Sequence, residues 1–168
     1  MWEPVKMSST TFRLEDRPDL VDRLASLSYR TEDGGLATMP HIYERLAKDD
    51  SGGAGVFSTA SDILKLLKSL LRKDGKVIKP ETTNLLFTPQ LGQGSIQALE
   101  ERLRNPATKL GVTFGLEDDI ALNHGLGGLL VLSDIDTGRK KNSLQWGGLP
   151  NLAWVTQCLT CSWEIRLC

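Results

Sequence analysis

A tryptophan followed by two glycines is the part of this sequence best suited to chemistry. The stretch Trp146-Gly147-Gly148-Leu149 continues an alternating strand pattern that starts at Ser143. Glycine is disfavoured inside a strand, because it adds no packing and loses much conformational freedom on folding. The pair therefore favours a backbone that another group approaches closely, either a ligand along a strand edge or a developing negative charge that needs N–H donors. A bulge or a tight bend would use the same residues, and the glycines alone leave both interpretations open.

A second glycine-rich stretch, residues 51–55, precedes an amphipathic segment that Ser58 opens. A loop of this kind before a helix can bind phosphate through its backbone N–H groups. The stretch lacks the Lys-Ser/Thr ending of a P-loop and the spacing of a dinucleotide fingerprint. A packing loop is therefore the default interpretation, and a nucleotide-binding enzyme is a distant alternative.

The histidines and cysteines have little chemical context. His124 lies beside a glycine-rich turn and could act as a general base, but no serine or aspartate partner can be assigned to it, so a structural or solvated histidine is favoured. His41 has still less context. Cys158, Cys161 and Cys168 form an odd cluster near the C-terminus, short of the four ligands of a zinc site. We interpret them as incidental thiols and expect neither a metal nor a cofactor.

Hydrophobic periodicity predicts helices in the first two thirds of the chain. The predicted segments are a short helix within 19–29, an amphipathic helix that runs from the N-cap Ser58 to a stop at Gly75, a helix from Pro80, and an amphipathic piece at 96–103. Residues 32–35 form a turn, and residues 36–50 are expected to be irregular.

The hydrophobic patterns in the last third of the chain predict strands. Alternation occurs at 112–116 and 120–122, a buried run covers 129–132, and further strand patterns cover 143–148 and 152–155. Residues 123–128 are a turn-like break, and residues 134–142 are a charged turn. The order predicts an α+β fold, with helices followed by an antiparallel sheet.

Composition excludes several classes of protein. The 168 residues fit one domain, and 20 Lys and Arg against 21 Asp and Glu give no electrostatic footprint for nucleic acid or an anionic membrane. No apolar run approaches the roughly 18 residues of a membrane span. The first residues lack a signal-peptide core. We therefore expect a cytoplasmic protein without a nucleic-acid or membrane partner.

Several stretches, taken in order, resemble the C-terminal half of the serine β-lactamase-like proteins. The resemblance covers residues 2–156 and is strongest to class C-type esterases and to fungal polyketide acyltransferases of the lovastatin-pathway type. The stretches that carry it are Glu3–Met7, Thr10–Phe12, Gly52–Asp62, Pro80–Thr82, Asn123–Leu129 and Trp146–Asn151. The resemblance implies a partial β-lactamase/transpeptidase-like domain at 1–156 and a divergent C-terminal tail at 157–168.

Members of this family carry three catalytic motifs, of which only the third, on an edge strand, has a counterpart here. By that match, the N–H of Leu149 would donate to an oxyanion, Trp146 would line the acyl pocket, and Gly147 and Gly148 would admit substrate. The first motif, Ser-x-x-Lys, supplies the nucleophile. No serine in the chain has lysine three residues later, and the family's tyrosine motif is also missing.

The resemblance therefore implies a truncated serine hydrolase or acyltransferase, with small-molecule acyl substrates if completed and a place in secondary metabolism. We expect it to be inactive alone, because the nucleophile is absent. The alternative is a non-catalytic binding or interaction module, in which the amphipathic segment 58–74 contacts a partner. A measurement of size in solution discriminates between a compact monomer and an aggregating fragment.

Overall fold

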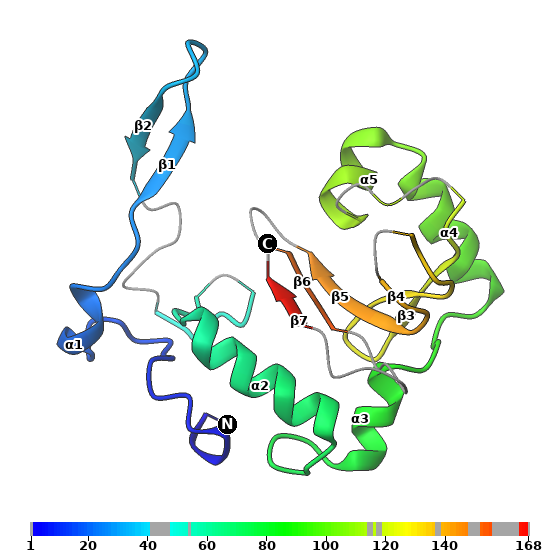
Figure 1. Ribbon diagram of the computed structural model, residues 1–168, viewed down its shortest axis with the longest axis horizontal. Helices are drawn as coiled ribbons and strands as arrows, with labels where there is room; N and C mark the ends of the chain where they lie inside the picture. Colours follow the sequence, from blue (N-terminus) through cyan, green and yellow to red (C-terminus); the bar gives the residue numbers. More distant parts are fainter. Residues whose placement is uncertain are drawn as a thin grey trace. The chain divides into compact units, whose positions relative to one another are not determined.

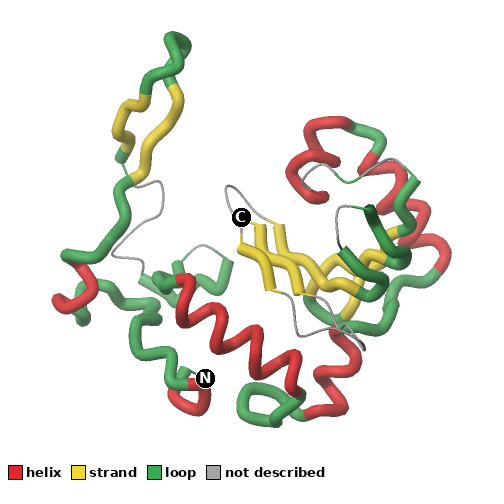
Figure 2. The backbone as a smooth tube through the Cα atoms, in the orientation of Figure 1, coloured by secondary structure: helices red, strands yellow, loops and turns green. Residues whose placement is uncertain are grey.

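The computed structural model describes residues 2–40, 48–53, 55–113, 116, 119–136, 139–147, 152–155 and 165–167 (Figure 1). The chain divides into two compact units. One unit comprises Trp2 and Lys6–Ile63, and the other comprises Met1, Glu3–Val5 and Leu64–Cys168. The 3₁₀ helix Glu3–Val5 belongs to the second unit. Both helices and antiparallel strands are present (Figure 2), which confirms the predicted α+β class.

The first unit contains a hairpin that the sequence did not predict. Helix α1 covers only Pro18–Val21, and the strands β1 (Leu27–Arg30) and β2 (Leu36–Met39) pair antiparallel. The short helix predicted within 19–29 is therefore confirmed only in its first residues, because β1 begins at Leu27, and the irregular structure predicted for 36–50 is wrong at Leu36–Met39. The predicted turn at 32–35 joins the strands, with Gly34 at a φ of 84° that favours glycine. Pairing across this turn outweighed a weak helical spacing of three leucines.

Helix α2 (Ala60–Arg72) has the predicted amphipathic character, with Leu67, Leu70 and Leu71 buried. Its N-cap is Thr59 rather than Ser58, because the Asp62 N–H donates to Thr59 Oγ1 at 3.2 Å. At its other end the chain turns at Lys73, with a φ of 52°, two residues before Gly75.

Asp62 ties the N-terminal segment to the start of α2. This buried carboxylate accepts the Ser9 N–H at 2.7 Å and the Thr10 hydroxyl at 2.9 Å. The Ser58 hydroxyl lies 2.8 Å from the Thr10 hydroxyl instead of capping the helix. The polar groups that follow the glycine-rich loop therefore form hydrogen bonds with other residues of the chain.

The remaining helices belong to the second unit. Helix α3 (Pro80–Leu86) begins at the predicted proline, α4 covers Gln93–Leu103, and α5 covers Pro106–Thr113. The strand alternation from Val112 is wrong, because Val112 lies in α5. Pro106 at the start of α5 is preorganised for a helix, and three alternating residues are too few to outweigh it.

Five strands form an antiparallel meander in consecutive order: β3 (Leu122–Gly125), β4 (Gly128–Val131), β5 (Ser143–Gly147), β6 (Leu152–Val155) and β7 (Ile165–Leu167). The strands predicted at 129–132, 143–148 and 152–155 are confirmed as β4, β5 and β6. Every neighbouring pair is antiparallel. The turn-like break predicted at 123–128 is wrong at both ends, because residues 123–125 belong to β3 and Gly128 begins β4, so only Leu126 and Gly127 form the turn. Strand β7 adds part of the stretch 157–168 to the sheet, which the sequence did not predict. All four residues of β4 are buried, as expected for the run 129–132.

One face of the sheet packs on a buried apolar cluster. Leu122, Val131 and Ser143 lie opposite one another, so their side chains share one face. Val131 packs there with Leu116 and Ile135 in a buried cluster. Trp146 lies three residues beyond Ser143 and therefore belongs to the other face.

Among the described residues, no helix has the length and apolar character needed for a membrane span.

Candidate functional site

Strand β5, which carries the tryptophan–glycine motif, is not an edge strand. It lies between β4 and β6 in the middle of the sheet, so the expectation of a wholly free edge is wrong. The two ladders differ in length, however. β4 pairs with Ser143–Gln145, whereas β6 pairs with Leu144–Gly147. At Trp146 and Gly147 the ladder continues on the β6 side and has ended on the β4 side.

Trp146 is fixed by the hairpin turn that precedes β4. Its indole Nε1–H donates to the Gly127 carbonyl oxygen at 2.7 Å. Gly127 has a φ of 107°, a backbone conformation that side chains other than glycine rarely adopt. The side chain of Trp146 is half-buried. The turn therefore anchors one edge of the indole and leaves part of the ring at the surface.

Glycines allow the hairpin to pack this tightly. A Cβ on Gly125 would lie 1.8 Å from the carbonyl oxygen of Leu86, at the end of α3. A Cβ on Gly128 would lie 2.6 Å from Leu144 Cδ1. The backbone joins the same elements, since the Leu126 N–H donates to the Leu85 carbonyl oxygen at 3.0 Å. The residues 123–128 thus connect α3 to the end of β5.

On the opposite face, Gln145 holds β5 to its surroundings. This buried side chain accepts from Arg139 Nη1 at 2.7 Å and donates to the Val112 carbonyl oxygen of α5 at 2.9 Å. Sequence reasoning missed Gln145, Arg139 and Gly127 as supports of the motif. The only available signal was a polar residue inside a strand that precedes Trp146.

The other candidate residues are not brought to this motif in the part of the chain that the structure describes. His124 lies on β3 opposite Leu129, and its carbonyl oxygen accepts the Gln90 N–H at 2.8 Å. Leu129 pairs in turn with Gln145, so His124 shares the face opposite Trp146. Gly148, Leu149, His41 and the three cysteines lie outside the described residues. Among those that are described, no group of three or more His, Cys, Asp or Glu could hold a metal ion.

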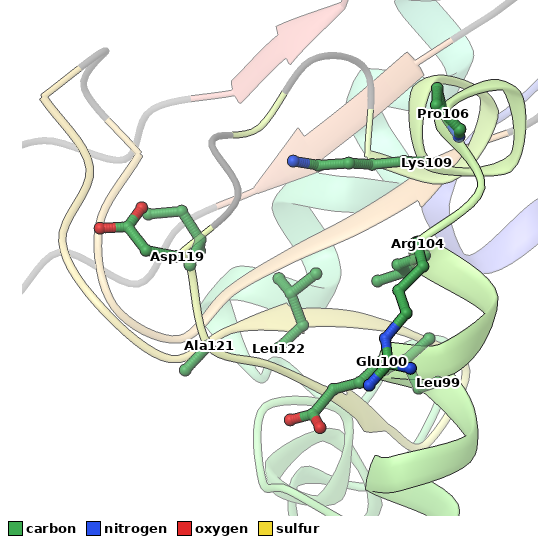
Figure 3. Close-up of a pocket in the computed structure, with 10 residues that line it drawn as sticks. Leu99, Glu100, Arg104, Pro106, Lys109, Asp119, Ala121 and Leu122 are labelled. Atoms are coloured by element: carbon green, nitrogen blue, oxygen red, sulfur yellow. The ribbon is translucent and has the colours of Figure 1, made fainter.

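A separate pocket of about 830 Å³ lies between α4, α5 and the segment leading into β3 (Figure 3). It combines apolar side chains with charges of both signs. Its lining comprises Leu99, Glu100, Leu103, Arg104, Pro106, Lys109, Asp119, Ile120, Ala121 and Leu122. Leu122 faces away from the Trp146 side of the sheet, so this pocket is not the tryptophan–glycine site.

The turn that leads into β5 is organised by Asp134. Its Oδ1 accepts the Lys141 N–H at 2.8 Å, and its Oδ2 lies 3.4 Å from Lys140 Nζ. The hydrogen bond from the Lys141 backbone, followed by the Lys140 side chain, holds the pKa of the Asp134 carboxyl below its ordinary value. The charged form is therefore favoured in the folded chain.

This pKa shift predicts a stability contribution that depends on pH. Because the folded pKa is depressed, the contribution is present above the unfolded pKa of about 3.9 and is lost as pH falls through the folded pKa. We expect Asp134→Asn to lower the urea midpoint at pH 7, and we expect the difference from wild type to shrink below pH 4. Asp136→Asn serves as the control, since Asp136 is an exposed carboxylate in the same turn. A difference that stayed constant down to pH 2 would contradict the assignment.

Comparison with known proteins reveals relatives over most of the chain, although no family model matches it. An acyltransferase, mokF, from Monascus pilosus is 34% identical over 90% of this chain, and monacolin J acid methylbutanoyltransferase from Aspergillus terreus is 35% identical over 90%. Lovastatin esterase from Penicillium rubens is 31% identical over 92%. This chain covers 38%, 37% and 39% of these proteins, respectively.

Comparison with solved structures also finds acyltransferases and a hydrolase. A simvastatin synthase variant (LovD6) from Aspergillus terreus matches 92% of this chain, with a TM-score of 0.83 and 31% identity, and 39% of that chain is covered. The hydrolase EstCE1, with promiscuous acyltransferase activity, matches 93% of this chain with a TM-score of 0.59 and 20% identity, which shows the fold alone. The match covers 41% of EstCE1.

Proposed function

We propose, from the premise that this chain belongs to the β-lactamase-like acyltransferases and esterases, that the end of β5 forms one wall of an acyl-transfer site. The observation that carries the proposal is the unequal pairing of β5. Its β6 ladder reaches Gly147 while its β4 ladder stops at Gln145. A strand flank released in this way is suited to an extended substrate or an oxyanion.

Each residue of the motif has a distinct proposed role. Trp146, anchored by its 2.7 Å hydrogen bond to Gly127, lines the acyl pocket. Gly147 and Gly148 let the substrate lie against the backbone. The Leu149 N–H donates to the oxyanion that forms when a nucleophile attacks the acyl carbonyl. The roles of Gly148 and Leu149 rest on the resemblance to the family.

The proposed substrates are small carboxylic esters or thioesters with short acyl groups. This proposal is supported by relatives whose names specify acyltransferase, methylbutanoyltransferase and esterase activities. The reaction class is acyl transfer to an alcohol or to water, in secondary metabolism. We assign residues 1–156 to this domain and residues 157–168 to a divergent tail that contributes β7 to the sheet.

The chain supplies the wall but not the nucleophile, because none of its serines begins a Ser-x-x-Lys motif. We therefore propose that activity requires a segment that carries this motif. The chain spans about two fifths of its relatives' length, so the part of a relative that it does not match is a suitable donor.

Complementation tests this function. The 168-residue chain is co-expressed with the unmatched part of the Aspergillus terreus methylbutanoyltransferase, and release of p-nitrophenol from its 2-methylbutanoate ester is measured. We expect hydrolysis only when both pieces are present. Trp146→Ala is expected to reduce kcat/KM by about 100-fold, because misplacing a bound acyl group by about 1 Å can have an effect of this size.

Trp146→Phe is the matched variant. It keeps an aromatic ring but loses the hydrogen bond to Gly127, so we expect a smaller reduction than for alanine. A co-purified complex that hydrolyses no ester would overturn the proposed function. An active complex in which Trp146→Ala leaves kcat/KM unchanged would overturn the role of the tryptophan.

A further inference from the structure

The near balance of charge over the whole chain conceals a local concentration of cations. Residues 65–79 contain six of the 20 Lys and Arg but only one of the 21 Asp and Glu. This stretch covers the C-terminal part of α2 and the loop that joins α2 to α3 (Figure 1), and it lies wholly within the second compact unit. We call its six cations the basic patch: Lys65, Lys68, Arg72, Lys73, Lys76 and Lys79.

The part of the basic patch on α2 forms one stripe along the helix. Lys65, Lys68 and Arg72 follow one another at intervals of three and four residues, which places them on one face. The buried leucines of α2 lie on the other side of the helix. Lys68 and Arg72 are exposed, and neither side chain forms an ion pair with another described residue. These two charges are therefore accessible to a ligand in solution.

The loop after α2 holds further lysines in place. The only acid in this loop, Asp74, accepts the Ser69 hydroxyl at 2.5 Å and the Lys76 N–H at 3.1 Å, so its carboxylate organises the turn. At the end of the loop, the Lys79 carbonyl oxygen accepts the Thr83 N–H at 2.9 Å. Lys76 and Lys79 are exposed, and Lys76 Nζ lies 3.4 Å from Asp74 Oδ2. Because the backbone is fixed at both ends, the loop presents its lysines next to the end of α2.

The helix dipole explains only part of this concentration. Arg72 lies in the last turn of α2, where a cation interacts favourably with the carbonyl end of the helix. Lys65 and Lys68 precede that turn, and the lysines of the loop lie beyond the helix. The remaining charges therefore call for an anionic ligand.

The composition of the basic patch discriminates between anionic ligands. It has five lysines and one arginine, and residues 65–79 contain no aromatic side chain. Protein interfaces are enriched in aromatic residues and arginine and depleted in lysine. Single-stranded nucleic acid is bound by stacking its bases on aromatic residues. A surface of anionic headgroups needs neither feature, because it attracts lysines through charge alone.

We propose that the basic patch adsorbs the chain to a membrane surface that carries anionic lipid headgroups. A cluster of about four to eight Lys and Arg on an amphipathic helix is typical of such binding. Leu67, Leu70 and Leu71 of α2 are buried, so the attraction is electrostatic and these side chains do not insert into the bilayer. The inference is independent of the proposed function, because it uses no residue of the tryptophan–glycine motif.

Vesicle sedimentation with the full 168-residue chain tests this inference. The probes are vesicles of phosphatidylcholine alone and vesicles in which about one third of the lipid is phosphatidylserine. At about 0.1 M salt we expect the chain to sediment only with the phosphatidylserine vesicles. The partition coefficient should fall about tenfold at about 0.5 M salt, because the Debye length shortens. Free glycerophosphoserine at the same headgroup concentration should not displace the chain, since one headgroup cannot contact the whole patch.

Removal of three charges from the basic patch gives the decisive comparison. The triple variant Lys68→Gln, Lys76→Gln, Lys79→Gln is expected to lower the partition coefficient by about 100-fold, because each lysine near an anionic surface contributes about fivefold. Arginine at the same three positions keeps the charges and should retain binding. If the glutamine variant did not fold in a circular dichroism melt, Lys68→Gln alone would decide the question, with an expected loss of about fivefold.

The matched control removes three exposed cations outside the basic patch and should leave sedimentation nearly unchanged: Lys48→Gln, Arg102→Gln and Lys141→Gln. It changes the net charge by the same amount, so it separates the patch from the charge of the whole chain. Four results would overturn the inference: equal sedimentation with both kinds of vesicle, unchanged sedimentation of the folded glutamine variant, an equal loss in the control, or tighter binding to duplex DNA than to the phosphatidylserine vesicles at the same salt concentration.

Discussion

The 168-residue chain is expected to keep its mass unchanged after incubation with a fluorophosphonate or a penicillin. These reagents acylate or phosphonylate a serine that a nearby base has activated. Ser69 comes closest to the family spacing, but Arg72 replaces the lysine, and arginine stays protonated in proteins. Ser69 is also only 5% exposed and donates its hydroxyl to Asp74 Oδ1 at 2.5 Å. In subtilisin, loss of the nucleophile costs about 10⁶ in turnover, and we expect an effect of that order.

Intact-mass spectrometry checks this result, with the Aspergillus terreus methylbutanoyltransferase as the positive control under the same conditions. Ser61 deserves separate inspection by peptide mapping, because Lys65 follows it by four residues instead of three. A covalent adduct on any serine of this chain would show that it carries its own nucleophile.

Gly125→Ala is expected to lower the free energy of unfolding by about 3 kcal/mol, at the upper end of the usual cost of overpacking. The new Cβ would lie 1.8 Å from the Leu86 carbonyl oxygen and 2.7 Å from the carbonyl carbon. Both are backbone atoms, so no side-chain rotation relieves the clash. Either α3 or the β3–β4 hairpin must move, and the hydrogen bond between Leu126 and Leu85 is lost with that movement.

Gly94→Ala is the matched control for urea unfolding. Gly94 lies in α4, and no atom lies within 4 Å of an added Cβ. The same substitution should therefore raise the free energy of unfolding by about 0.5–1 kcal/mol, because alanine is the better helix former. Equal midpoints for Gly125→Ala and wild type would mean that α3 does not pack on the hairpin as described.

Local sequence patterns predicted the elements whose signals are strong. The apolar face of α2, the proline that starts α3, and the buried run in β4 each depend on residues close in sequence, and each was recovered. Predictions failed where a weak pattern competed with a contact distant in sequence. Ser58 is a good capping residue, but its hydroxyl lies against Thr10, 48 residues away, and Thr59 caps the helix instead.

The tryptophan–glycine motif shows the same difference between local sequence patterns and contacts distant in sequence. The order of Trp146 and two glycines was sufficient to single out this strand. It could not show that β5 lies inside the sheet, because strand neighbours are set by pairing with β4 and β6 rather than by residues of β5. Nor could it identify Gln145 and Arg139 as supports, since a buried polar pair is recognised only when its partners are known.

The sequence by itself indicated the resemblance to the β-lactamase-like acyltransferases, the α+β class, an antiparallel meander in the last third and the absence of a Ser-x-x-Lys motif from these 168 residues. These follow from residue types, their periodicity and their order along the chain. Only the tertiary structure decided that the β4 ladder stops short of the β6 ladder at Trp146, that Gly127 anchors the indole, and that the Leu126 N–H is bonded to the Leu85 carbonyl oxygen of α3. Each of these features depends on backbone groups that meet across turns and between elements. Such hydrogen bonds produce no periodic pattern in the sequence.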